Sequence, residues 1–400
     1  MSSASLEMRV LYSFPDGLGA PGIGTTARHQ VEGLLARDIE VSVWCTSLHC
    51  ELPRARRVVT TLQVAGVRVP HRALGGSDRA YRYHDLRVAG ALRRLAGDFD
   101  VVHVWPRASL HTARAARALG LRTVREAPNT HTGYAFAAVV RECELLGIAP
   151  PPGHSHTFDA RRLRHEEAEY EAADVILCQS EFSRATFVER GVPAAKVAVH
   201  QNGTDVARFR PAQAQRPVGK PLTALFAGRL EPRKGLHYAL RAWARSGAGE
   251  RGGRFVVCGE FVPGYREVVA PLLDDPSVEV RGYVPDLSEL MRQSDVFVLP
   301  SVEEGSALVT YEAQACGCVL AVSDATGARC EHRRTGLVHP ARDVDALAAH
   351  LRELEGDPAL LARLRAATVA RLDELTWDRS AEQQAGVYAA ALAGDIGASG

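Results

Sequence analysis

Short apolar runs rich in β-branched residues alternate with amphipathic stretches along most of the chain, and this alternation constrains the fold more than any other feature. It is typical of α/β domains whose parallel sheets are covered by helices on both faces. The sequence predicts strands at 8–14, 40–45, 101–105, 122–125, 175–178 and 196–200, and again at 223–226, 254–258, 278–281, 296–299 and 319–322.

The strand pattern stops and restarts around the segment 207–221, which contains three prolines and little periodicity. A chain of 400 residues is also too long for one ordinary hydrophobic core. We therefore predict two doubly wound, Rossmann-like domains, over 1–210 and 211–377, followed by a helix in 378–400 that packs back on the first domain. Their sheets are expected to face a central cleft at the carboxyl ends of the strands.

Composition excludes several classes of protein. The net charge of +1 gives no overall field for binding nucleic acid. No run of about 18 apolar residues predicts a spanning helix, and the start MSSASLEMRVLYSF lacks the basic and apolar regions of a signal peptide. A cytoplasmic location is therefore expected. The eight cysteines are scattered without a CxxC pair, so neither a zinc site nor a disulfide framework is predicted.

The sequence GLGAPG at 17–22 matches the GxGxxG pattern of dinucleotide-binding loops. Two features weaken that interpretation: Pro21 stands where a helix should begin, and the strand 40–45 is followed by no carboxylate for a ribose hydroxyl. The remaining alternatives are a flexible turn and a glycine loop, continuing through Gly24 and Thr25, whose backbone approaches a ligand across the cleft.

The segment FAGRLEPRKG begins at the end of a predicted strand and leads into a predicted helix. Arg229 and Lys234 lie five residues apart on this loop, and Lys234 is one of three lysines in the chain. Two cations beside the amino end of a helix form a site suited to a pyrophosphate. A surface loop with ordinary charges is the alternative.

The segment PSVEEGSALVTYEAQACG begins at Pro300, directly after another predicted strand. Ser306 is expected to cap the helix that follows, which places Glu304 just before the helix and Glu312 about two turns inside it. Eight helical steps rise about 12 Å and rotate about 80°, so both carboxylates can line one elongated ligand. Carboxylates suit vicinal hydroxyls, and the first helical turn offers N–H groups to phosphate. Glu303 is expected to be a solvated neighbour.

These motifs, taken in order, resemble the retaining glycosyltransferases of family 4, which have the GT-B fold. The resemblance covers nearly the whole chain. It is carried by GRLEPRKG, by the E-x7-E pair Glu304 and Glu312, and by the tail RRTGLVHPARDVDAL. The middle segments AADVILCQSEFSRATFVERGV and VAVHQNGTDVARFRP add to it. The resemblance implies that the N-terminal domain takes an acceptor and that the C-terminal domain binds a nucleotide-sugar donor.

The resemblance also implies roles for individual positions. Arg229 and Lys234 would neutralise the donor's diphosphate, Glu304 would bond the transferred sugar, and Glu312 would bond the ribose. Glu260 and Tyr283 would border the base. The other implied donor-binding positions are Gly24, Thr25, Gly305, Ser306, Ala307, Leu308, Gly259 and Val284.

One motif departs from the family. The HxH pair that often follows a strand near the middle of the first domain reads His103-Val104-Trp105 here, so the second histidine is a tryptophan. His103 is then interpreted as a satisfied strand histidine. The segment EAPNTHTGY offers Glu126 or His131 instead, and we count His131 with the predicted catalytic residues. The alternative is a loop held by local side-chain bonds.

The sequence therefore predicts a retaining, metal-independent hexosyltransferase acting in glycan, glycolipid or natural-product biosynthesis. A UDP-sugar is favoured as donor over a GDP-sugar, the acceptor is a hydroxyl compound, and no cofactor is expected besides the donor. No DxD cluster follows a strand, so no metal site is predicted. A sugar-nucleotide epimerase of the same fold and a non-catalytic sugar-nucleotide-binding protein are the alternatives. Peripheral contact with a membrane is left open, and no nucleic-acid partner is expected.

Overall fold

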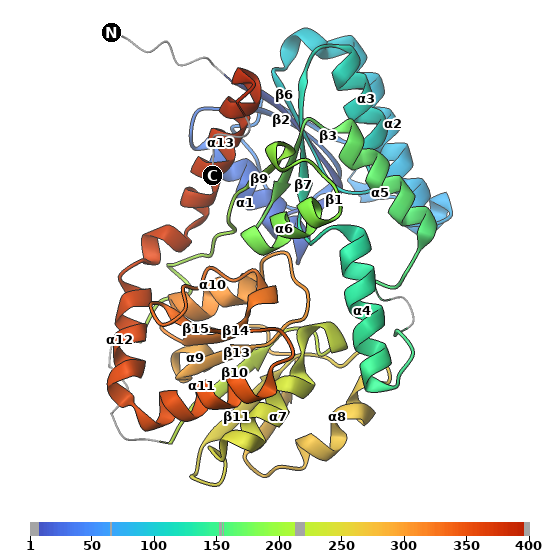
Figure 1. Cartoon of the computed structure of the whole chain (residues 1–400). Coiled ribbons are helices and arrows are strands. Elements are labelled where there is room, and N and C mark those ends of the chain that lie inside the picture. The colour runs from blue at the N-terminus through green and yellow to red at the C-terminus, as the bar shows by residue number, and fades with distance from the viewer. Residues whose placement is uncertain (1–7, 65, 152–153, 155, 213–220, 396–400) are drawn as a thin grey trace.

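The structure is a computed structural model that describes residues 8–64, 66–151, 154, 156–212 and 221–395. The chain forms two α/β halves, each built from a parallel sheet and the helices that cover it, and the two lie one above the other in Figure 1. The C-terminal helix runs back along the N-terminal half. Residues 213–220 of the predicted linker lie outside the described residues, as do the chain start at 1–7 and the end at 396–400.

Seven parallel strands form the N-terminal sheet in the spatial order β3-β2-β1-β6-β7-β8-β9. The runs of Val, Ile and Leu favour this buried arrangement, and every residue of β8 is buried. A short antiparallel pair, β4 and β5, lies outside the sheet. The strands are β1 (Arg9–Leu18), β2 (Glu40–Leu48), β3 (Arg57–Thr60), β4 (Gln63–Val64), β5 (Val67–Arg68), β6 (Val101–Val104), β7 (Arg122–Ala127), β8 (Val175–Cys178) and β9 (Val197–Val199).

Helices connect these strands and cover the sheet. They are α1 (Ile23–Leu35), α2 (Ser77–Leu95), α3 (Leu110–Ala118), α4 (Thr132–Leu146), α5 (Ala160–Ala172) and α6 (Glu181–Glu189), with short 3-10 turns η1 (His71–Leu74), η2 (Ala96–Asp98) and η3 (Ala194–Lys196). Helix α4 stands beside both halves of the molecule (Figure 1), and its buried Glu142 bonds His237 of the C-terminal half at 2.9 Å.

Six parallel strands form the C-terminal sheet in the order β12-β11-β10-β13-β14-β15. The strands are β10 (Thr223–Ala227), β11 (Arg254–Cys258), β12 (Val278–Gly282), β13 (Val296–Leu299), β14 (Val319–Ser323) and β15 (Gly336–His339). The helices are α7 (Leu236–Ser246), α8 (Tyr265–Leu273), α9 (Ser288–Arg292), α10 (Leu308–Ala315), α11 (Val344–Gly356), α12 (Pro358–Val369) and α13 (Trp377–Ala393), with 3-10 turns η4 (Pro232–Lys234), η5 (Asp324–Thr326) and η6 (Leu372–Leu375).

The strand order reverses between β10 and β13, and ligands of doubly wound sheets bind beyond the carboxyl ends of the strands at such a switch point. The loops that leave these two strands begin at Gly228 and Pro300. They contain the two segments that the sequence singled out, so the topology brings those segments together at one sheet edge.

Two chain segments cross between the halves. The Thr204 N–H donates to the Leu375 carbonyl at 2.7 Å, and Thr204 forms a parallel bridge with Thr376. Helix α13 then packs against α1, and its Tyr388 hydroxyl bonds Nδ1 of His103 at 2.8 Å. The domain limits at residues 210 and 377 stay a prediction.

The strands β8, β11 and β13 have the predicted bounds, whereas β1 is longer than predicted. It continues to Leu18, so the glycine-rich sequence begins inside a strand, and α1 begins at Ile23. The strands β3 and β15 were not predicted. Within the described part of the chain, none of the helices combines the length and apolar character needed to cross a membrane.

Candidate active site

Lys234 and Glu304 meet at the switch point of the C-terminal sheet. Lys234 ends η4, directly before Gly235 and α7, and its ammonium donates to a carboxylate oxygen of Glu304. The two side chains are 12% and 10% exposed. The structure thus brings together the cation and the carboxylate that the sequence placed on separate loops.

Arg233, which sequence reasoning missed, lies beneath this pair and is held by three carboxylates. It bonds Glu231 through Nε at 3.0 Å, and its Nη1 lies 3.1 Å from Glu304 and 3.3 Å from Glu303. Burial alone would lower the pKa of Arg233, but Glu304, Glu231 and Glu303 together raise it above its usual value. Arg233 therefore stays charged and fixes the carboxylates around it. Its place beside Lys234, in a loop of alternating charges, was the available signal.

Glu303 is not the solvated neighbour that the sequence suggested. Its side chain is fully buried, because the N-terminal half covers it. The Thr130 hydroxyl donates to Glu303 Oε1 at 2.6 Å across the two halves, and the other carboxylate oxygen pairs with Arg233. Glu303 therefore joins the halves behind the site.

We expect Glu303→Ala to lower the free energy of unfolding by about 2–4 kcal/mol, because it leaves the buried Arg233 with one fewer carboxylate and Thr130 without its acceptor. Urea unfolding followed by circular dichroism measures the change. Glu289→Ala, at a carboxylate that is 64% exposed, is the control and should change stability by less than about 0.5 kcal/mol. Equal stabilities of the two variants would contradict the buried role of Glu303.

A pocket of about 460 Å³ lies beside the loop that carries Lys234. Arg229 borders it, is 56% exposed and lies 3.8 Å from Glu231. The predicted base-binding positions Gly259, Glu260, Tyr283 and Val284 also line this pocket, together with Gly228, Cys258, Phe261, Val262, Pro263 and Leu287. The pocket is lined mostly by apolar residues, and the exposed Arg229 guanidinium lies at its rim, which suits a flat ring joined to an anion.

Helix α10 begins one residue later than expected. Ala307 occupies the N-cap position and makes no side-chain cap bond, so Ser306 does not cap the helix. The Ser306 hydroxyl donates instead to the Gly327 carbonyl at 3.0 Å. The Thr310 N–H donates to the Ala307 carbonyl at 2.9 Å, which leaves the N–H groups of Leu308 and Val309 at the start of α10 for another acceptor.

Glu312 lies in α10 and is half-buried. Burial raises the pKa of its carboxyl to about 7, an effect that Arg208 opposes and Asp286 reinforces. No hydrogen bond or ion pair within the described residues engages the carboxylate. A carboxylate of this kind carries a desolvation cost that hydroxyl donors from a ligand would offset.

His131 and Glu126 are buried in the N-terminal half. His131 caps α4, since its Nδ1 accepts from the Gly133 N–H at 3.1 Å, and burial lowers the pKa of its imidazole to about 4. Its catalytic role stays a prediction. Glu126 lies within β7 and not on the loop after it, and it is fully buried. It pairs with His200 at 3.0 Å, and the fully buried His103 lies 3.5 Å away.

The glycine loop of the first half makes local bonds. A Cβ at Gly24 would lie 2.2 Å from the Gly17 carbonyl oxygen, and the Thr25 hydroxyl donates to the Ala20 carbonyl at 3.2 Å. The glycine is therefore needed for the loop's own close approach, and phosphate binding by Gly24 and Thr25 stays a prediction.

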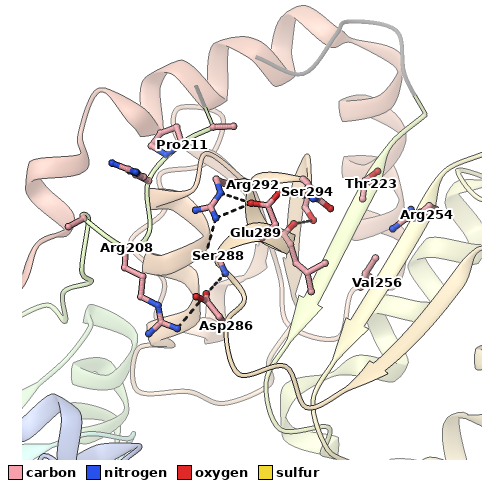
Figure 2. A pocket seen from close by; sticks show the side chains of 15 residues that line it. Arg208, Pro211, Thr223, Arg254, Val256, Asp286, Ser288, Glu289, Arg292 and Ser294 are labelled. Carbon is pink, nitrogen blue, oxygen red and sulfur yellow. Dashed lines mark hydrogen bonds and ion pairs between the residues drawn. The ribbon is translucent and has the colours of Figure 1, made fainter. Parts of the chain in front are cut away.

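A second, larger pocket of about 860 Å³ runs along α9 and the segment after Val206 (Figure 2). Four of its charged side chains form two pairs: Arg208 points toward Asp286, 3.4 Å away, and Arg292 bonds Glu289 at 3.0 Å. It reaches Thr223 and Arg254, the first residues of β10 and β11, and so extends toward the sheet edge opposite Lys234. We therefore do not assign the donor to it.

Comparison with known proteins agrees with this geometry. The family model described as Glycosyltransferase Family 4 matches residues 21–208, and the model described as Glycosyl transferases group 1 matches residues 221–357. The D-inositol 3-phosphate glycosyltransferase of Streptomyces bingchenggensis is 27% identical over 90% of this chain and 83% of its own length. The glycogen synthase of Mycobacterium tuberculosis is 28% identical over 80% of this chain and 72% of its own.

Solved structures show the same fold. Sucrose-phosphate synthase from Thermosynechococcus elongatus superposes with a TM-score of 0.68 at 20% identity, over 96% of this chain and all of its own. Anabaena HepE, solved with UDP, gives 0.66 at 17% identity with the same coverage. Two facing doubly wound halves with a site between them define the GT-B fold. The chain belongs to the group 1, family 4 glycosyltransferases.

Proposed function

We propose that this glycosyltransferase moves a sugar from a nucleoside-diphosphate donor, with UDP favoured as the nucleotide, to a hydroxyl acceptor with retention at the anomeric carbon. The observation that carries the proposal is the contact of Lys234, just before α7, with Glu304, four residues before α10, beside a pocket bordered by Arg229. Anabaena HepE has been solved with UDP and with UDP-glucose, which supports a uridine nucleotide. A cytoplasmic reaction that needs no metal ion is part of the proposal.

Transfer breaks the bond between the sugar and the diphosphate, and negative charge develops on the departing phosphate oxygens. Stabilising that charge is the largest contribution a site of this kind can make. Lys234, Arg229 and the first-turn N–H groups of α10 would supply it. The diphosphate would replace Glu304 as the partner of the Lys234 ammonium. The Glu304 carboxylate would then be available to accept a hydrogen bond from a hydroxyl of the sugar.

Retention by double displacement needs a carboxylate nucleophile on the far side of the sugar ring. The neighbouring carboxylates already have partners: Glu303 bonds Thr130 and Arg233, and Glu231 bonds His154 at 2.6 Å. We therefore favour attack from the side of the leaving group, with a diphosphate oxygen receiving the proton of the acceptor hydroxyl.

Calorimetric titration with UDP-, GDP-, dTDP- and ADP-sugars tests the donor. We expect binding of a UDP-sugar and a weaker response to the others. Incubation with the bound sugar nucleotide alone should release nucleotide slowly by hydrolysis and give no epimer. Formation of an epimer, or binding of no sugar nucleotide, would overturn the proposal.

The raised pKa of Glu312, about 7, makes donor binding pH-dependent in this proposal. Ribose hydroxyls donate to the ionised carboxylate, so affinity should rise by up to about tenfold between pH 6 and pH 8. The free protein shows the opposite trend: its folded state binds the extra proton, so the contribution of Glu312 to stability falls as pH rises from its ordinary pKa toward 7.

Titration with a UDP-sugar at several pH values measures this dependence, because UDP itself gains charge in the same range whereas the diphosphate of a UDP-sugar does not. Glu312→Gln should flatten the pH dependence. An unchanged slope in that variant would remove Glu312 from the binding site.

A further inference from the structure

The loop that carries Glu304 is held by three side chains from the other half of the molecule. They follow three successive strands of the N-terminal sheet. After β7, the Thr130 hydroxyl donates to Glu303 at 2.6 Å; after β8, the Ser180 hydroxyl donates to the Gly305 carbonyl; after β9, the Asn202 amide donates to the Ser306 carbonyl at 3.2 Å. Glu303, Gly305 and Ser306 are therefore each bonded by a side chain of the other half.

Asn202 differs from the other two because it also belongs to the connection between the halves. It lies two residues before Thr204, where the two connecting segments cross at the 2.7 Å bond to Leu375. Asn202 is 1% exposed, so its amide has no water to replace a lost partner. Rotation of one half about this crossing would move the Asn202 amide relative to the Ser306 carbonyl.

A chain of buried hydrogen bonds fixes the Asn202 side chain in the N-terminal half. Its amide N–H group donates to Gln179 Oε1 at 2.9 Å, and the Gln179 amide donates to Glu126 Oε1 at 3.1 Å. Glu126 is in turn bonded to His200 at 3.0 Å and is fully buried. This chain links the buried Glu126 to Asn202 through the single side chain of Gln179.

We propose that Asn202 is a positioning residue that couples the hinge between the halves to the shape of the donor loop. When the halves close, its amide holds the Ser306 carbonyl away from the cleft, so that the first-turn N–H groups of α10 face the diphosphate. When they open, this bond breaks and the loop relaxes. The inference rests on the proposed donor site and adds a residue that contacts neither donor nor acceptor.

Asn202→Asp tests it, because the variant has nearly the same shape but replaces the N–H donor by an oxygen. The probe is the sugar nucleotide that binds tightest in the titration panel. We expect its Kd to change less than about threefold and its hydrolysis rate to fall about 10- to 100-fold. The donor-induced decrease in radius of gyration, measured by small-angle X-ray scattering, should also disappear.

Asn202→Ala is a second variant in case the aspartate variant does not fold. It should show the same fall in hydrolysis rate and the same loss of donor-induced compaction. Gln293→Glu, which adds the same charge at an exposed position, is the control and should match the wild type. A loss of stability alone would lower the melting temperature and leave the hydrolysis rate per folded molecule and the compaction unchanged.

Two results distinguish a failure of the inference about Asn202 from a failure of the proposed function. If the wild type binds and becomes more compact, and both Asn202 variants do so with normal hydrolysis, the inference is wrong and the donor site stands. If the wild type binds no sugar nucleotide, the proposed function and this inference both fall.

Discussion

Replacing Lys234 with alanine is expected to lower turnover about 100- to 1,000-fold while the chain stays folded. The Lys234 ammonium contacts Glu304 on the loop before α10, so its loss removes a stabilising charge from the departing diphosphate. The fold should survive because Arg233 stays within 3.1 Å of Glu304 and keeps that carboxylate paired. Turnover of the best donor and the far-ultraviolet circular dichroism spectrum measure the two effects.

Lys196→Ala is the matched control. Lys196 lies in η3 of the N-terminal half, where its ammonium donates to the Glu171 carbonyl at 3.0 Å. Turnover of this variant should equal that of the wild type. Turnover of Lys234→Ala within a factor of about three of the control would count against a diphosphate site at Lys234.

Gly305→Ala is expected to abolish most turnover, by more than about 100-fold, through the contact between the two halves. A Cβ at Gly305 would lie 2.1 Å from the Pro128 carbonyl oxygen and 2.9 Å from the Asn129 Cα. These are backbone atoms, which cannot turn aside as a flexible side chain can. The variant should therefore hold the halves apart, and a bound donor would stay exposed to water instead of being enclosed with the acceptor.

Small-angle X-ray scattering with and without the donor measures this effect, and the radius of gyration should stay large in the variant. Gly356→Ala is the control, because no atom lies within 4 Å of the added Cβ and the residue ends α11. Normal compaction and turnover in Gly305→Ala would show that the close approach to Pro128 is not needed for the reaction.

Much of the fold could be predicted because its signals are local. The strands β8, β11 and β13 are continuous apolar runs, and they have the predicted bounds. The approach of Lys234 to Glu304 also followed from sequence, since each residue comes shortly after a strand of one parallel sheet. Carboxyl ends of such strands share an edge, so no long-range information was needed.

The rest of the site depends on contacts between distant segments. Glu303 and Glu304 are neighbours and look alike in the sequence, but Thr130, 173 residues earlier, buries Glu303. Arg233 is buried beside the same carboxylate, with its Nη1 3.3 Å from Glu303. Glu126 was expected on a loop because the predicted strand ended at Arg125, yet β7 continues through Ala127 and places the Glu126 side chain in the interior.

A crystal structure of the chain with UDP is the most direct test of the donor site. The diphosphate should contact Lys234 and the first-turn N–H groups of α10, and the uracil should lie in the 460 Å³ pocket beside Gly259 and Val284. Glu312 should lie within hydrogen-bond distance of the ribose hydroxyls. A nucleotide bound along α9 in the larger pocket, with Lys234 still paired to Glu304, would contradict the proposed site.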